Sequence, residues 1–381
     1  MKSLLENLKI LDFTSLLPGP YATLMLADMG ADIIKINSKS REDIILTNSA
    51  KVNNKSANML WLNRNKKTIS LNLKKKKSVD IIKKMIMEYD IVIESFTPGV
   101  MRKFGLSYEE LKCVNPKIIY CSISSYGQTG SLKQYSGHDI NLLAKSGISY
   151  MSGTPKLIST PIGGLAASNN AVIGILSAVN YRNFTGKGQH IDISILDLLI
   201  NYNALEANEY LITNYNKKPA SSLLNGGSLY DYYETNDNRY IAFGAIEPGF
   251  FKRFCEIMGL EELIDEGVFP DDVNTAKFKL KELFKSKNYN YWINLFEKEN
   301  ICITGVENLE EVLNGNFVKE RKSTINLEGI NQLALPIKFS DFNPEYKFTG
   351  KEIGTDTYKI LKYFGYKDSE IEDFKREDIF K

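Results

Sequence analysis

The sequence is poor in the residues that build metal and redox centres. Among 381 residues it has two histidines, His138 and His190, and four cysteines. The cysteines lack the short spacings of zinc or iron–sulfur ligands and lie at Cys113, Cys121, Cys255 and Cys302. We therefore expect free thiols in a reducing compartment, and neither a metal nor a prosthetic group.

Long hydrophobic runs and a strong charge bias are also missing. The N-terminus alternates charged residues with leucines, unlike a signal peptide, and no window resembles a membrane span. The formal net charge of +2 gives no reason to expect a nucleic-acid or anionic membrane partner. With 43% hydrophobic and 25% charged residues, the chain reads as an ordinary soluble protein, and we expect it in the cytoplasm.

The first 125 residues alternate short apolar strands with helices. Strands are expected near 9–14, 33–36, 68–73, 90–94 and 118–123, and helices over 21–29, 78–89 and 110–114. This alternation predicts an α/β fold with an open, Rossmann-like parallel sheet. The phosphate-binding Gly-x-Gly-x-x-Gly after the first strand is absent, so the pattern alone does not imply a dinucleotide.

The rest of the chain predicts a second domain. A buried helix rich in small residues is expected over 170–181, a strand over 190–195 and a long helix over 196–214. Composition changes at Asn216-Lys-Lys-Pro, and Lys/Glu-rich helical patterns follow. We expect a large α/β domain over 1–215, a small α+β domain over 225–325, and a C-terminal segment over 326–381 that returns to the large domain.

His138 is the candidate proton-transfer group. It follows Gly137 and precedes Asp139 at the expected start of a helix. A histidine beside a carboxylate can exchange protons near neutral pH, and the alternative is a structural histidine. His190 falls on the polar face of its expected strand, where a structural or exposed role is expected.

A series of short motifs runs through nearly the whole chain. In order they begin at Leu11-Asp-Phe-Thr, Pro18-Gly-Pro, Gly30-Ala-Asp, Ile93-Glu-Ser-Phe-Thr-Pro-Gly, Ser125-Tyr-Gly-Gln, Gly137-His-Asp, Thr185-Gly-Lys-Gly-Gln, Gly244-Ala-Ile-Glu-Pro, Leu335-Pro-Ile and Gly354-Thr-Asp-Thr. As a set they resemble the family III CoA transferases (CaiB/BaiF type) and the related α-methylacyl-CoA racemases.

This resemblance implies a CoA thioester as substrate and a homodimer whose subunits interlock like chain links, with a heterodimer of paralogues as the variant. By position it implies a CoA site at Leu16, Leu17, Ser38, Lys39, Leu71, Lys74, Ser95, Phe96 and Lys103. Lys103 and Lys74 are the expected phosphate cations, with Lys39 or Arg41 as stand-ins. The family's transferases often carry arginine at the position of Ser38 and asparagine at that of Ser95, so nucleotide binding is expected to differ here.

The resemblance also implies a catalytic set, and one member is missing. The family's racemases use the histidine of Gly-His-Asp, here His138, oriented by the glutamate of Gly-Ala-Ile-Glu-Pro, here Glu247. The family's aspartate, which acts as transferase nucleophile or as second racemase base, is replaced by Gly164, or by Gly163 in the racemase register. The segment 156–191 contains no Asp or Glu, so no shift of the alignment restores it.

Three functions remain open without that aspartate. The first is acid–base chemistry on an acyl-CoA through His138 and Glu247. The second is CoA transfer with a nucleophile from elsewhere, such as Asp139 or a partner subunit. The third is a non-catalytic CoA-binding subunit. By position, Gly226 and Gly227 correspond to a glycine-rich loop that closes over the active site in the transferases, and a hinge between domains is the alternative.

Overall fold

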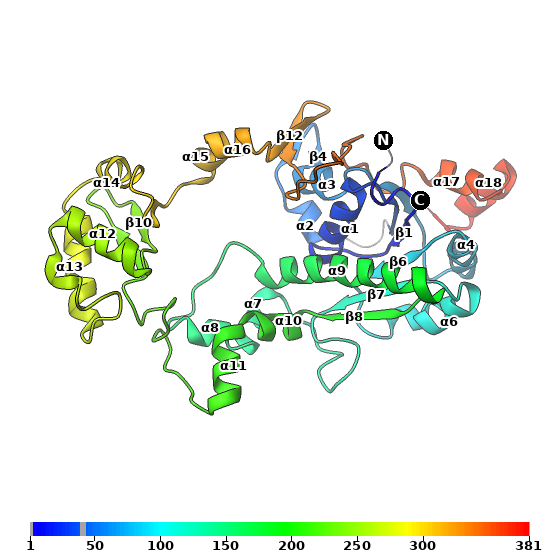
Figure 1. The fold of residues 1–381 in the computed structure, drawn as a ribbon. Helices are drawn as coiled ribbons and strands as arrows, with labels where there is room; N and C mark the ends of the chain where they lie inside the picture. Colours follow the sequence, from blue (N-terminus) through cyan, green and yellow to red (C-terminus); the bar gives the residue numbers. More distant parts are fainter. Residues whose placement is uncertain (1–2, 39–42, 381) are drawn as a thin grey trace. The chain divides into compact units, whose positions relative to one another are not determined.

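The computed structural model describes residues 3–38 and 43–380. The chain forms two compact units (Figure 1). Unit 1 comprises 1–146, 158–202 and 320–381, and unit 2 comprises 147–157 and 203–319. The segments 147–157 and 203–215 therefore belong to unit 2, whereas the sequence pattern assigned them to the large domain.

A six-stranded sheet forms the centre of unit 1. Its strands, in spatial order, are β5 (Lys67–Ser70), β2 (Asp32–Asn37), β1 (Lys9–Asp12), β6 (Ile91–Glu94), β7 (Ile119–Ser124) and β8 (His190–Ser194). Every neighbouring pair is parallel, which confirms the predicted open parallel sheet. The strand order reverses its direction between β1 and β6. In open α/β sheets ligands bind beyond the carboxyl ends of the strands at such a reversal.

Helices cover both faces of this sheet (Figure 1). On one face α1 (Pro18–Asp28) and α9 (Ile162–Thr185) pack on inward-facing residues such as Ile10 and Ile91. The small side chains Ala167, Ala171 and Ala178 line the buried face of α9. The residues that alternate with these along the strands, such as Leu11 and Val92, face the other side of the sheet. Its helices are α4 (Lys76–Ile86), α6 (Tyr108–Val114), α17 (Thr357–Tyr363) and α18 (Asp368–Arg376).

Shorter elements complete unit 1. The helices are α2 (Ile44–Thr47), α3 (Ala57–Leu62), α5 (Val100–Lys103), α7 (Asp139–Lys145) and α10 (Ile195–Tyr202). Two antiparallel hairpins pair β3 (Lys51–Val52) with β4 (Lys55–Ser56), and β12 (Thr324–Leu327) with β13 (Ile330–Leu333).

Unit 2 has its own aromatic core. An antiparallel sheet with the order β11 (Ile303–Gly305), β10 (Tyr240–Phe243), β9 (Asp231–Glu234) packs against helices around Phe254, Phe284 and Trp292. The indole N–H of Trp292 donates a hydrogen bond to the Phe284 carbonyl over 2.8 Å, so its one polar group is satisfied. The helices of the unit are α8 (Ile148–Met151), α11 (Ala204–Thr213), α12 (Pro248–Met258), η1 (Glu261–Leu263), α13 (Val273–Lys285), α14 (Tyr289–Phe296), α15 (Leu309–Asn314) and α16 (Asn316–Glu320).

Two helices differ from the sequence prediction. The expected long helix over 196–214 is two helices, because α10 ends at Tyr202 and α11 begins at Ala204. Helix α9 begins earlier than expected, and by length and composition alone it could cross a membrane, which corrects our reading that no window does so. Half of its most apolar window is buried in the protein, as expected of the core helix of a globular unit.

Candidate functional site

Two loops meet at the point where the strand order reverses. The loop after β1 carries Ser15 to Leu17, and the loop after β6 carries Ser95 and Phe96. The backbone N–H of Ser15 donates to Ser95 Oγ over 3.1 Å and so ties the loops together. Leu16 adopts a positive φ of 63°, which is costly for a branched side chain, and its N–H donates to Asp43 Oδ2 over 2.8 Å.

A buried charge cluster supports the loop after β1, which we call the first loop. Asp12, at the end of β1, is fully buried. Its carboxylate lies 3.0 Å from Lys35 Nζ and 3.7 Å from Lys66 Nζ, and it accepts hydrogen bonds from the Thr14 and Thr23 hydroxyls. Lys35 also donates to the Thr14 carbonyl, and Lys66 donates to the Pro20 carbonyl, so both ends of the loop are fixed.

In this cluster, burial and the neighbouring charges shift the pKa values of Asp12 and Lys66 in opposite directions. Burial alone would raise the pKa of Asp12, but the ammonium groups of Lys35 and Lys66 and the two hydroxyls lower it to about 2. Burial lowers the pKa of Lys66 to about 7, although Asp12 opposes the shift. The sequence signal for this cluster is a charged residue inside each of two apolar strands, Asp12 in β1 and Lys35 in β2.

A cavity of about 180 Å³ opens beside this loop in unit 1. Four of the residues expected to bind CoA line it: Ser38, Leu71, Lys74 and Phe96. The ring of Phe96 meets that of Phe104 edge-on at 6.4 Å, and Lys35 and Asp43 also face the cavity. The cavity therefore combines an apolar wall with cations, as a nucleotide with phosphates requires.

The other expected CoA residues do not line this cavity. Leu17 precedes α1, and Leu16 and Ser95 hold the loops in place through the contacts given above. Lys103 lies at the end of the short helix α5, with its side chain exposed. Lys39 and Arg41 lie outside the described residues. The sequence did not indicate Asp43, whose carboxylate binds the N–H of Leu16 and caps α2.

His138 stands immediately before α7, as predicted, in an extended conformation and exposed to solvent. Its backbone N–H donates to Asn141 Oδ1 over 3.0 Å, which fixes the start of the helix. The next residue, Asp139, reaches α9: its Oδ1 accepts a hydrogen bond from the N–H of Gly164 over 3.1 Å. A carboxylate thus satisfies a free N–H at the positive end of α9.

Gly164 and Gly163 differ in the space around them. A Cβ at Gly164 would meet Leu17 Cδ2 first, at 3.6 Å, which is an ordinary contact. A Cβ at Gly163 would lie 2.8 Å from Asp139 Oδ1 and 2.9 Å from Ile195 Cγ2, which is too close. The backbone therefore has room for a side chain at Gly164 and none at Gly163.

The first loop connects the cavity with the start of α9. Residues Phe13 to Ser15 and Pro20 line the cavity. A Cβ built at Gly164 would lie nearest to side-chain atoms of Leu17 and Pro18. The Pro18 carbonyl also accepts a hydrogen bond from Ser168 Oγ over 2.7 Å. The loop thus touches the cavity on one side and the Asp139–Gly164 pair on the other.

The remaining candidate residues lie in unit 2. Glu247 is exposed and stands immediately before α12. Gly226 has a φ of +85°, and a Cβ there would lie 2.2 Å from the Ala220 carbonyl oxygen; at Gly227 it would lie 2.2 Å from that of Ser221. Close backbone packing thus requires both glycines, whatever their further role. Within 3–38 and 43–380, no group of three or more His, Cys, Asp or Glu residues is placed to hold a metal ion.

Comparison with known proteins agrees with the motifs. The model of "CoA-transferase family III" matches residues 5–357. The chain is similar to human alpha-methylacyl-CoA racemase (29% identity, 98% of this chain and 97% of the relative) and to human succinyl-CoA:glutarate CoA-transferase (31%, 94% and 85%). It also resembles the crystal structure of a CAIB/BAIF family protein from Brucella suis (TM-score 0.84, 25% identity, 96% and 100%). The family match spans nearly the whole chain, and we conclude that this protein belongs to CoA-transferase family III.

Proposed function

We propose that this protein is an acyl-CoA-processing enzyme in which His138 exchanges the proton on the carbon next to the thioester carbonyl. One observation carries the proposal: the carboxylate of Asp139, the residue after His138, binds the N–H of Gly164, where the family aspartate is missing. The acid–base candidate His138 thus immediately precedes a carboxylate that contacts the start of α9, where the usual residue is absent.

We propose that the nucleotide end of CoA binds at the mouth of the cavity beside the first loop. Leu71 and Phe96 supply an apolar wall, and Lys74 supplies a cation at its edge. We propose that Lys74 and Lys103 bind the phosphates of CoA. The pantetheine arm then follows the loop past Leu17, whose side chain is next to Gly164, and brings the thioester to His138.

Glu247 is proposed as the carboxylate that orients the His138 ring. A carboxylate beside an imidazole fixes its tautomer and stabilises its protonated form, so His138 would become a stronger base. We propose that the turn at Gly226 and Gly227 acts as a lid that keeps water from the thioester.

CoA transfer is the second candidate, and the position of Asp139 favours it. Among the described residues no donor is bonded to Asp139 Oδ2, so this oxygen is free to attack a thioester carbonyl. The attack would expel the CoA thiolate and form an acyl–aspartyl anhydride. The thiolate would then attack the aspartyl carbonyl, which releases the first acid and leaves an aspartyl–CoA thioester. A second carboxylate would attack this thioester to form a new anhydride, and the thiolate would attack its acyl carbonyl, which yields the new acyl-CoA and frees Asp139.

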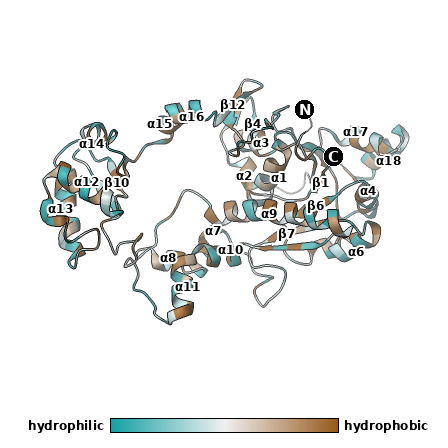
Figure 2. Cartoon of the chain, in the orientation of Figure 1, coloured by the Kyte–Doolittle hydropathy of each residue, from teal (hydrophilic) through white to brown (hydrophobic). Residues whose placement is uncertain are grey.

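We propose a homodimer as the assembly. Helices α9 and α11 carry hydrophobic residues (Figure 2), and several of their large apolar side chains are exposed to solvent. The most exposed are Phe184 on α9, at 82%, and Leu205, Leu211 and Ile212 on α11, at 72–79%. Surfaces of this kind mark contacts between proteins, and a second copy of the chain is the occupant that the resemblance implies.

The test incubates the purified protein in D₂O with 2-methylacyl, 2-hydroxyacyl and straight-chain acyl-CoAs. Mass spectrometry follows deuterium uptake and, in parallel, CoA exchange to added carboxylic acids. We expect deuterium uptake that falls about 10²-fold or more in His138→Ala. The matched control is Asn141→Ala, which changes the same helix start but removes no acid–base group.

The outcomes separate the three functions. Deuterium uptake that needs His138 supports the proposal. CoA exchange that occurs without deuterium uptake and is lost in Asp139→Asn overturns the proposal and supports CoA transfer through Asp139. Asn at position 139 can still accept the hydrogen bond from Gly164, so this variant removes only the negative charge. CoA binding with neither activity overturns both and leaves a non-catalytic subunit, to be tested beside a catalytically complete relative.

A further inference from the structure

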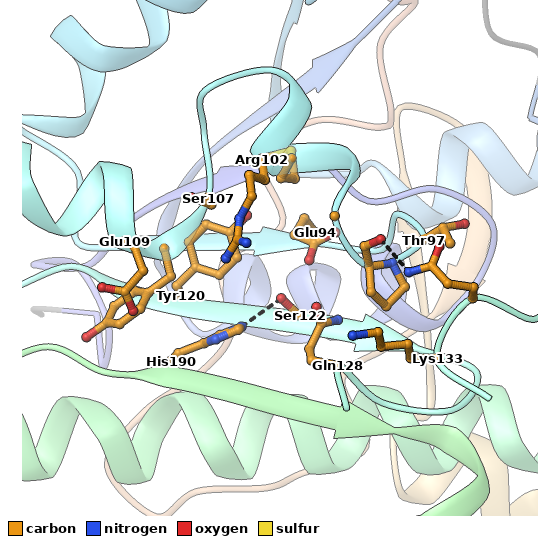
Figure 3. A pocket seen from close by; sticks show the side chains of 15 residues that line it. Glu94, Thr97, Arg102, Ser107, Glu109, Tyr120, Ser122, Gln128, Lys133 and His190 are labelled. Atoms are coloured by element: carbon orange, nitrogen blue, oxygen red, sulfur yellow. Dashed lines mark hydrogen bonds between the residues drawn. The ribbon is translucent and has the colours of Figure 1, made fainter. Parts of the chain in front are cut away.

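A second cavity in unit 1, of about 280 Å³, has no part in the proposed reaction. It lies between the end of β6, the helix α5, the strands β7 and β8, and the segment around Gln128 and Lys133 (Figure 3).

The floor of this cavity is a buried carboxyl group. Glu94 is 4% exposed, and its Oε2 accepts the N–H of Phe96 over 2.8 Å. Burial raises the pKa of Glu94 to about 7, against the opposing hydrogen bonds from Ser122 and Phe96. Within the described ranges no lysine or arginine forms a salt bridge with this carboxyl group, so with a pKa of about 7 it can both donate and accept a hydrogen bond at neutral pH.

The rim carries charges of both signs: Arg102 and Lys133 are cations without a salt-bridge partner among the described residues, and Glu109 also lines the cavity. Figure 3 shows Arg102 reaching from α5 toward the middle of the cavity and the ammonium group of Lys133 directed inward from the opposite side. In the described part of the chain, neither side chain has an acidic group within 4.0 Å, since every charged pair found there involves other residues. Two cations on separate elements face one cavity.

A buried donor is also left open. Gln128 Nε2 is inaccessible to solvent and has no hydrogen-bond partner in the described region, although the backbone N–H of the residue is bonded to Asp192. Leaving such a group unpaired in the interior is unfavourable, and a ligand oxygen that accepts from it would remove this cost. His190 Nε2, by contrast, is already paired with Ser122 Oγ at 2.9 Å.

We propose that this cavity binds a small organic carboxylate. Its negative charge would lie between Arg102 and Lys133, with one oxygen accepting from Gln128, because a planar guanidinium and an amide match a carboxylate. A hydroxyl or second carboxyl group of the same ligand would pair with Glu94. A purely apolar ligand would leave the polar floor unpaired.

This second cavity is joined to the proposed CoA cavity through one residue pair. Glu94 faces the former, and the residue whose N–H it binds, Phe96, lines the latter. A ligand on Glu94 therefore acts on the segment that forms the CoA wall. The inference does not depend on the reaction at His138, since binding can be measured without turnover.

The test is calorimetric titration of the intact protein with succinate, malate and citrate, and separately with inorganic phosphate. We expect saturable binding of at least one carboxylate. The double variant Arg102→Gln/Lys133→Gln should weaken it at least tenfold, and Gln128→Ala should weaken it several-fold. The control, Lys117→Gln/Lys187→Gln, removes two exposed cations outside the cavity and should leave the affinity unchanged.

Four results would overturn the assignment. They are no saturable carboxylate binding, equal weakening in the control variant, binding of phosphate alone, and simple competition between the carboxylate and CoA. The last would make the cavity part of the CoA site. Circular dichroism of each variant separates lost binding from lost folding, and the substituted cations are exposed, so folding is expected to persist.

Discussion

The carboxylate of Asp139 accepts a hydrogen bond from the backbone N–H of Gly164 over 3.1 Å. The two residues are far apart in sequence, and one of them stands where the family aspartate is missing. We propose that Asp139, carried by α7, supplies the carboxylate that the sequence lacks on α9. This proposal makes Asp139 the residue to remove and Gly164 the position at which to restore an aspartate.

Gly164→Asp is expected to raise CoA exchange between an acyl-CoA and a free carboxylic acid by on the order of 10²-fold. The new side chain has room, with Leu17 Cδ2 at 3.6 Å from its Cβ, and an acidic residue is favoured in the first turn of a helix. Exchange is measured by mass spectrometry with labelled acid. Adding Asp139→Asn removes the neighbouring like charge and keeps the acceptor for the N–H.

The control is Gly163→Asp on the same turn. Its Cβ would lie 2.8 Å from Asp139 Oδ1, so we expect lower stability and no gain in exchange. If Gly164→Asp folds and binds CoA but gains no exchange, the start of α9 is not where the thioester reacts.

Lys74→Ala is expected to weaken CoA binding about tenfold, which corresponds to about 1.4 kcal/mol. Lys74 is the lysine at the mouth of the proposed nucleotide cavity, and losing a charge-assisted bond to phosphate costs that order. Calorimetric titration at two salt concentrations measures the effect, which should shrink as salt rises. Lys76→Ala, two residues along and outside the cavity, should bind CoA as the unchanged protein does. Equal affinity of both variants would place the phosphates elsewhere.

Local pattern was sufficient for the parallel sheet. Strands such as β6 and β7 are short, apolar and regularly spaced, and parallel sheets leave that signature because both faces are buried. The motif resemblance placed Leu71 and Phe96 in one site, and both line one cavity. Those predictions depended only on residues near each other in sequence or on position in a motif.

Contacts between distant segments could not be read in the same way. The bonds of Asp43 to Leu16 and of Asp139 to Gly164 join residues whose spacing carries no periodic signal. The break between α10 and α11 was missed because the apolar pattern continues through it. The second cavity needed the folded chain, since its cations Arg102 and Lys133 come from separate elements.

Asp12→Asn is expected to destabilise the protein by about 3–5 kcal/mol, because it leaves the buried ammonium groups of Lys35 and Lys66 without a carboxylate. Urea unfolding at pH 7 measures the loss. The stability contributed by Asp12 is present above about pH 4 and is lost as the pH falls toward 2, since folding lowers its pKa. The control is Asp32→Asn, whose partner Lys67 is partly exposed, and we expect a change below about 1 kcal/mol. A similar small change at Asp12 would mean that the cluster does not hold the loop.

Glu94→Gln is expected to remove a pH dependence of stability between about 4.5 and 7. The pKa of Glu94 rises from 4.5 to about 7 on folding, so in this window the folded state binds more protons than the unfolded state. Its contribution to stability is therefore complete below pH 4.5 and falls as the pH rises, by up to about 3 kcal/mol at 1.4 kcal/mol per unit. Glutamine keeps an oxygen for the Phe96 N–H but cannot ionise, so the free energy of unfolding of the variant should lose this part of the slope. Urea titrations of both proteins from pH 4 to 8 give the difference directly. Parallel curves would show that Glu94 is ionised and solvated in the folded protein, and the floor of the second cavity would then be a fixed negative charge.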